Sequence, residues 1–156
     1  LNTDGAAQAT YAIQNEIRLM PGIYLQAMAR LGVSSGVMPE SLRLKASELR
    51  SIETERANHI AVGSLSLELP GVGDLPYSLF HLAMVDRVHT RGFVTCGAGW
   101  TSLGEFGTTS ASVEAGLEQI VELSTLGGML SVTIKLGFAT PVRGEGEAAF
   151  YATISL

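Results

Sequence analysis

The amino-acid sequence predicts an α+β fold: N-terminal helices followed by a mainly antiparallel β-sheet with one further packed helix. Three observations support this class. Apolar residues recur at spacings of three and four in the first third of the chain and again over residues 110–127, as on one face of a helix. After residue 58, apolar and polar residues alternate in several segments, as in half-buried strands. Short connections rich in glycine and proline favour antiparallel pairing of these strands.

Three helices are predicted within residues 1–57. The first follows Asp4, a candidate N-cap, and Pro21-Gly22 separates it from the second, residues 23–31. The third covers residues 39–57 and begins with a proline. Their apolar positions are Ala9, Ile13, Ile17 and Met20 in the first, Tyr24, Met28 and Leu31 in the second, and Leu42, Ala46, Leu49 and Ile52 in the third. We expect this helical arm to serve in docking or oligomerisation, because its acidic and basic residues balance.

Strands are predicted next. Residues 64–69 alternate leucine with polar residues and end in a turn-forming segment, residues 70–74. The run 75–88 is almost continuously apolar; a strand is favoured there over a short helix, although periodicity alone does not decide between them. Residues 94–100 alternate again, and their glycine-rich side predicts that another part of the chain packs closely on it.

The last third predicts a helix and a hairpin. Ser110 can cap a helix that ends at Gly127-Gly128. Residues 130–138 then alternate without interruption, and residues 150–156 continue the pattern after a turn-rich connection. These two segments are expected to pair as an antiparallel hairpin.

Composition limits the function classes. The 156 residues suit a single domain, 1–156, with the helical arm 1–57 and a sheet-bearing part 58–156 that carries the whole net charge of −5. Ten basic residues argue against nucleic-acid binding. No apolar run reaches the length of a membrane-spanning helix, so we expect no membrane partner and a soluble protein, with the cytoplasm favoured. One cysteine excludes an internal disulfide.

Four residues are candidates for a ligand pocket: His81, His89, Cys96 and Trp100. Histidine and cysteine are metal ligands and can form a nucleophile pair, and tryptophan can line an apolar pocket. In an extended chain His81 and His89 lie about 26 Å apart at ~3.3 Å per residue, too far to share one ion. A buried cysteine on a strand is more often a small hydrophobe than a nucleophile. We therefore expect no metal, no cofactor and no catalytic residue.

One patterned charge feature predicts an interface. Glu114, Glu118 and Glu122 recur every four residues on the predicted fourth helix, where no basic residue offsets their repulsion. A solvated acidic face is the simpler interpretation. The alternative is that the stripe meets arginines of the helical arm, from the same chain or from a second subunit: Arg43, Arg50 and Arg56.

Several short segments resemble parts of the hot-dog-fold acyl-thioester dehydratases. They are Met20-Pro21-Gly22 with Ala27-Met28-Ala29, Leu75-Pro76 with Val85-Asp86-Arg87-Val88, and Phe138 with Pro141-Val142 and Gly144. Their order differs from that of the family, Gln26 stands where an acid is expected, and the family's catalytic histidine motif is missing. The resemblance implies acyl-thioester binding and no catalytic residue.

Two functions follow as hypotheses. The first is a noncatalytic acidic domain that acts through homo-oligomerisation or by binding a protein partner, because 46% hydrophobic and only 16% charged residues leave few charges to discourage association. The second is a small-molecule or acyl-thioester binding protein or enzyme with a hot-dog-like pocket. Whether the protein is an enzyme stays open at this point.

Overall fold

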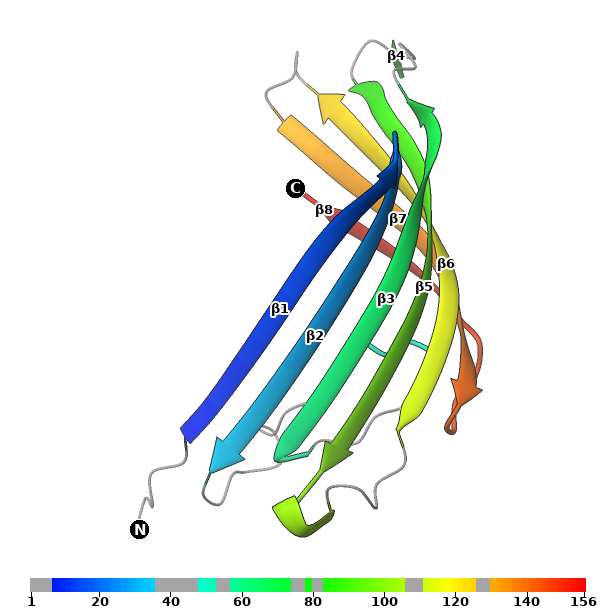
Figure 1. The fold of residues 1–156 in the computed structure, drawn as a ribbon. Helices are drawn as coiled ribbons and strands as arrows, with labels where there is room; N and C mark the ends of the chain where they lie inside the picture. The colour runs from blue at the N-terminus through cyan, green and yellow to red at the C-terminus, as the bar shows by residue number, and fades with distance from the viewer. Residues whose placement is uncertain are drawn as a thin grey trace, which may run out of the picture.

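The fold is one antiparallel β-sheet, seen in a computed structural model that describes residues 7–35, 48–52, 57–73, 78–79, 83–105, 111–125 and 130–156. Seven strands follow one another across the sheet in the order β1-β2-β3-β5-β6-β7-β8, and β4 pairs with β5 beside this path. The strands are β1 (Ala7–Met20), β2 (Ile23–Ser35), β3 (His59–Gly73), β4 (Ser78–Leu79), β5 (Ala83–Trp100), β6 (Ser112–Thr125), β7 (Leu130–Arg143) and β8 (Ala149–Ser155). Figure 1 shows them as a strongly twisted, curved sheet with β1 and β8 at its two edges.

The predicted α+β class is wrong: the described part of the chain is all-β apart from a short 3₁₀ helix, η2 (Leu103–Glu105). Strands β1, β2 and β6 replace three of the four predicted helices, so residues 1–57 are not a helical arm where the structure describes them. Most of the helix predicted over 39–57 lies outside the described residues. The physical reason is periodicity. A spacing of four residues is a multiple of two, so positions such as Ile13 and Ile17 share a face in a strand as well as in a helix.

Several strand predictions are confirmed. The segment 64–69 lies in β3, 94–100 lies in β5, and 130–138 lies in β7. The turn predicted from residue 70 is wrong, because β3 continues to Gly73 and the irregular stretch from Pro70 to Gly73 only shifts its register against β5. The predicted hairpin is present, since β7 pairs antiparallel with β8 from Thr133 and Ser155 to Ala139 and Ala149. Of the ambiguous run 75–88, residues 78–79 form β4 and residues 83–88 belong to β5, as favoured, whereas residues 75–77 and 80–82 lie outside the described part. Among the described residues, no helix has both the length and the apolar character needed to cross a membrane.

Pro21-Gly22, predicted to separate two helices, instead forms the turn between β1 and β2. Met20 pairs with Ile23 across it, and Gly22 has a φ of 78°. Proline at the second position of a four-residue turn and a glycine with positive φ at the third match a type II turn. The dipeptide therefore reverses the chain direction between β1 and β2 and sets the register of this first hairpin.

The strand register divides the side chains between two faces. One row of cross-strand partners runs through all seven strands as Ile17, Leu25, Leu67, Gly92, Leu117, Phe138 and Phe150. The neighbouring row runs as Arg18, Tyr24, Glu68, Arg91, Glu118, Gly137 and Tyr151. Successive side chains of a strand point to opposite sides of the sheet, so these rows lie on opposite faces. We call the face of Leu117 the outer face and the face of Glu118 the inner face.

The buried apolar residues gather where segment 48–52 packs on the inner face. Leu49, Ile52 and Val62 form one buried cluster, and Ile60 is 1% exposed. A bridge between Ile52 and Gly146 extends this contact toward the β7–β8 turn. The predicted close packing on the glycine side of β5 is confirmed, because a Cβ at Gly99 would lie 3.0 Å from the Cβ of Ala57.

Candidate functional site

The inner face carries a buried carboxylate, Glu118, at the centre of β6. Its side chain is 1% exposed and accepts hydrogen bonds from Arg50, Arg91 and Tyr151. Arg91 is its cross-strand partner on β5, and Tyr151 lies beyond Gly137 on β8, with its hydroxyl 2.9 Å from the carboxylate. Glycine at 137 leaves room for the tyrosine ring, since a Cβ there would lie 2.2 Å from a ring carbon of Tyr151.

A second buried carboxylate, Glu114, holds segment 48–52 by its backbone. One carboxylate oxygen accepts bonds from the amide N–H of Arg50 (2.7 Å), the amide N–H of Ser51 (2.8 Å) and the hydroxyl of Ser51 (2.9 Å). The Arg50 guanidinium lies 4.1 Å from the centroid of the Tyr151 ring and 5.5 Å from that of Phe93. The acidic pair therefore anchors segment 48–52 on the sheet.

The electrostatics keep Glu118 ionised and Tyr151 neutral. Burial alone raises the pKa of the Glu118 carboxyl, but hydrogen bonds from Arg50 and Arg91 outweigh it and hold that pKa below its ordinary value of 4.5. Burial, and then the bond donated to Glu118, raise the pKa of the Tyr151 phenol. Burial lowers the pKa of the Arg50 guanidinium, but contact with Glu118 more than restores it. This charge arrangement suits a structural anchor better than a proton-transfer site, because the pKa values of Glu118, Tyr151 and Arg50 are all moved away from neutral pH.

This arrangement makes stability depend on pH. The Glu118 pKa is lower in the folded chain than in the unfolded one, so the stabilisation is present above the unfolded value of 4.5 and is lost as the pH falls through the folded value. We expect the unfolding free energy to decrease on acidification below about pH 5, and to decrease less in Glu118→Gln. Urea titrations at a series of pH values measure both slopes. Equal slopes in the two proteins would contradict the assignment.

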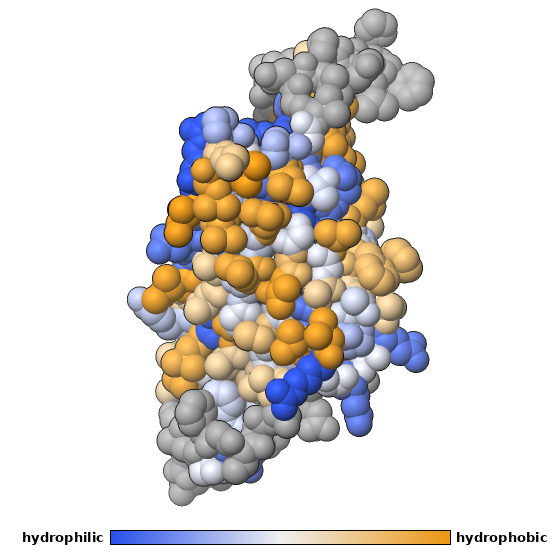
Figure 2. Space-filling model, turned by 45° about the vertical axis from the view of Figure 1, so that its right-hand side comes forward, coloured by the Kyte–Doolittle hydropathy of each residue, from blue (hydrophilic) through white to orange (hydrophobic). Residues whose placement is uncertain are grey.

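The outer face, in contrast, exposes large apolar side chains. Leu117 is 60% exposed and Phe150 85%. Further exposed apolar residues on this face are Tyr11, Ile13, Ile17, Leu31, Val33, Leu65, Leu67, Val94, Leu136 and Ile154. Figure 2 shows hydrophobic residues spread over much of the visible surface. Soluble monomers rarely expose contiguous apolar patches larger than a few hundred Å², so this face is a candidate interaction surface.

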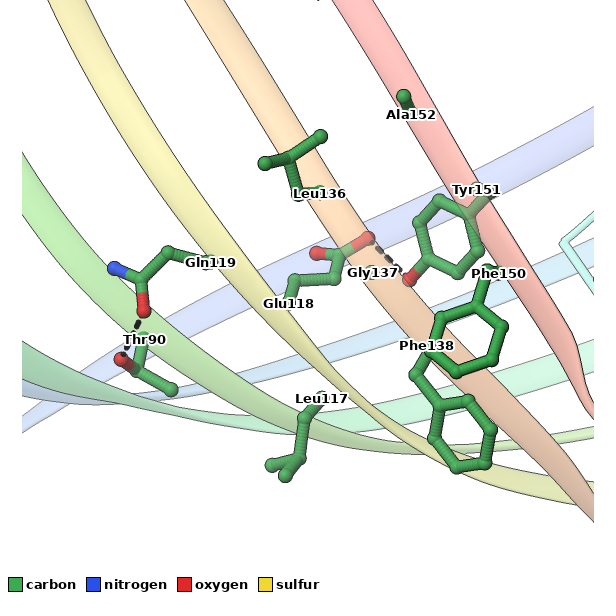
Figure 3. A pocket seen from close by; sticks show the side chains of 10 residues that line it. All are labelled: Thr90, Leu117, Glu118, Gln119, Leu136, Gly137, Phe138, Phe150, Tyr151 and Ala152. Carbon is green, nitrogen blue, oxygen red and sulfur yellow. Dashed lines mark hydrogen bonds between the residues drawn. The ribbon is translucent and has the colours of Figure 1, made fainter.

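Two hollows lie on the outer face. One, of about 650 Å³, lies over β6, β7 and β8 among Leu117, Leu136, Phe138 and Phe150 (Figure 3). The two phenylalanine rings are tilted against each other with centroids 4.9 Å apart. The other, of about 470 Å³, lies over β1, β2, β3 and β5 among small residues such as Ala29, Gly63 and Ala98. Both could accept flexible apolar chains.

The four pocket candidates do not form one site in the described residues. Cys96 is exposed on the outer face, in register with Gly63 and Val113, whereas His89 is 5% exposed on the inner face, 3.4 Å from Glu68. Trp100 lies at the end of β5 and stacks on His59. His81 lies outside the described residues. No group of three or more histidine, cysteine or acidic side chains among the residues described is placed to hold a metal ion.

The predicted acidic stripe lies on strand β6, where Glu114 and Glu118 are on the inner face of the sheet. Their spacing is therefore about 13 Å at ~3.3 Å per residue rather than one helical turn, and the repulsion expected on a helix does not arise. Arg50 contacts Glu118 within the same chain. Glu122 pairs in register with Arg87, and Arg43 and Arg56 lie outside the described residues. Sequence reasoning missed Arg91 and Tyr151. The alternation over residues 150–156 was a usable signal for Tyr151, because it puts this residue on the side of the sheet away from Phe150.

Fold and site together define the class: an all-β antiparallel meander whose inner face buries charge and whose outer face exposes apolar side chains. Comparison with protein-family models, with curated proteins and with solved structures finds no match.

Proposed function

We propose that this chain is a noncatalytic association module whose outer sheet face is the contact surface. One observation carries the proposal: a cross-strand row from Ile17 to Phe150 spans seven strands without a charged residue, while the adjacent row on the inner face contains four charged residues. These are Arg18, Glu68, Arg91 and Glu118. Arg50, from segment 48–52, adds an ion pair to Glu118.

The surface differs from the interface predicted from the sequence. The glutamates of that interface are turned inward at Glu114 and Glu118, where they bind the chain's own segment 48–52. Apolar side chains on the opposite face are the groups that gain free energy by leaving water, at about 25 cal/mol per Å². Self-association or binding to another protein therefore uses the outer face.

Paired substitutions in β1 test this role, because β1 is exposed on both faces. Ile13→Glu with Ile17→Glu places two charges on the outer face, and Ala12→Glu with Gln14→Glu places two on the inner face. We expect the first pair to shift the association equilibrium of the purified chain toward smaller species, because charges buried in an apolar contact are costly. Sedimentation velocity measures the shift. A monomeric parent chain, or equal behaviour of the two pairs, would contradict the proposal.

A small-molecule role is a second candidate, favoured by the hollow beside Phe138 and Phe150. An acyl chain is the ligand that its apolar walls suit, as the resemblance to acyl-thioester proteins also implies. We expect a fluorescent fatty-acid probe to bind the chain several-fold more weakly after Phe150→Ala, which removes one wall of this hollow, than after Tyr11→Ala, which removes another exposed aromatic ring, on β1. Equal affinities would exclude the hollow as the site.

A further inference from the structure

We propose that the outer face lies against the hydrocarbon interior of a phospholipid bilayer. This inference rests on the proposed contact surface, the outer face, and goes beyond self-association or protein binding by assigning that surface a lipid partner. Three features of the face point to lipid rather than to a second protein surface: the charge distribution between the two faces, the directions in which the apolar area is bounded, and the length of the strands.

The charge distribution is inverted relative to a water-soluble fold. In the described part of the chain, two of the three largest fully buried side chains are glutamates, Glu114 and Glu118. On the outer face, the row beginning at Ile17 has uncharged neighbours on both sides. These rows are Asn15, Ala27, Leu65, Val94, Ala115 and Thr140, and Leu69, Thr90, Gln119, Leu136 and Ala152. Alternation of apolar outward and polar inward residues is the pattern of strands that face lipid on one side.

The apolar area is bounded only along the strands. At one end of the sheet, the exposed Arg143 pairs in register with the outward Val113 and is followed by Glu145 and Glu147. At the other end, the exposed Asp86 and Arg87 lie on the inner side, against Ser124 and Glu122. Across the sheet, the area continues unbroken to both edges. A protein–protein contact has a polar rim on all sides. A band limited in one direction and open in the other matches the slab geometry of a bilayer.

The strand length matches the same slab. The outward residues of β7 alternate from Leu130 to Thr140, before a register shift that pairs Arg143 with Val113, and this stretch corresponds to about 33 Å along a strand at ~3.3 Å per residue. At the tilt of about 45° common for membrane strands, this length spans about 23 Å, close to the ~25 Å height of the apolar band of membrane-spanning strands. The backbone groups along the free edges of β1 and β8 also need partners in hydrocarbon. Strands of further copies can supply them in a purified system.

Cys96 provides the test, because it is the only cysteine and is exposed on the outer face. The full chain is refolded with dioleoylphosphatidylcholine vesicles and labelled at Cys96 with an environment-sensitive fluorophore. Matched variants carry Cys96→Ala with either Asn15→Cys, an outer position, or Gln14→Cys, its inward-facing neighbour. Nitroxide on the lipid acyl chains and iodide in the water serve as quenchers, and circular dichroism verifies that each variant keeps its β-structure.

We expect the fluorophores at positions 96 and 15 to lose most of their emission to the lipid nitroxide and little to iodide, and the fluorophore at 14 to behave oppositely. Iodide access to all three in the presence of vesicles would overturn the lipid assignment. Protection of positions 96 and 15 by self-association without vesicles, with no lipid quenching, would also overturn it while leaving the association role intact. Exposure of these positions under both conditions would remove the association role as well.

Discussion

Glu118→Ala is expected to lower the free energy of unfolding by about 3–5 kcal/mol, the cost typical of breaking a buried ion pair by removing one partner. The carboxylate is 1% exposed and forms ion pairs with both Arg50 and Arg91. Its removal leaves both guanidinium groups without this counter-charge and takes away the acceptor of the Tyr151 hydroxyl. Urea unfolding followed by circular dichroism measures the loss.

Glu122→Ala is the matched control, since it removes the same charge from the same face and strand. Glu122 is partly exposed and makes no ion pair within the described residues, so its loss is expected to cost under about 1 kcal/mol. Similar losses in both variants would show that Glu118 acts only through net charge and not through its buried contacts.

Gly116→Ala is expected to cost about 3 kcal/mol, the upper range for forcing extra atoms into a packed site. A Cβ at Gly116 would lie 2.3 Å from the carbonyl oxygen of Phe138 and 2.5 Å from the ring of Phe93. The carbonyl belongs to the backbone of β7, so the clash cannot be relieved by a side-chain rotation alone. The expected result is a lower urea midpoint with the sheet register disturbed between β6 and β7.

Gly92→Ala serves as the comparison for this variant. Its Cβ would meet only the side chain of Leu117 at 3.6 Å, an ordinary contact. We expect its unfolding free energy to stay within about 1 kcal/mol of the parent, because alanine also restricts the unfolded chain more than glycine does. If Gly92→Ala lowers the unfolding free energy as much as Gly116→Ala does, the close approach of β7 is not the cause of the loss in Gly116→Ala.

The sequence allowed strands to be predicted where alternation was the only pattern present, as over residues 130–138. It misled where apolar residues four apart satisfied helix and strand together, as at Ile13 and Ile17. In such a segment the positions two residues away decide: Tyr11, two residues before Ile13, is also apolar and outward, which favours a period of two. Helix propensity did not correct the assignment, because pairing with neighbouring strands overrides local preference.

The candidate site was predictable only in part. The spacing of Glu114 and Glu118 indicated that they act together. Their role, however, depends on Arg91 from the adjacent strand and on Arg50 from a separate segment. Neither strand register nor the packing of a distant segment can be read from one sequence. The separation of Cys96 from His89 was predictable once both are placed on one strand. They lie an odd number of residues apart, and such positions face opposite sides of a sheet. The expectation of no membrane partner was based only on the lack of a long apolar helix. The outer face shows that a sheet can also present a large apolar surface.

The meander order of the sheet has a consequence for how the chain folds and varies. Each strand on the main path pairs with its neighbours along that path, so pairing requires only the closure of short or moderate loops. Because each pairing joins only neighbouring strands, the stability of the sheet is approximately a sum over adjacent strand pairs. A hairpin can then be gained or lost at either edge without rethreading the rest. Sheet width is thus free to change, while strand length and the chemistry of the two faces stay the same.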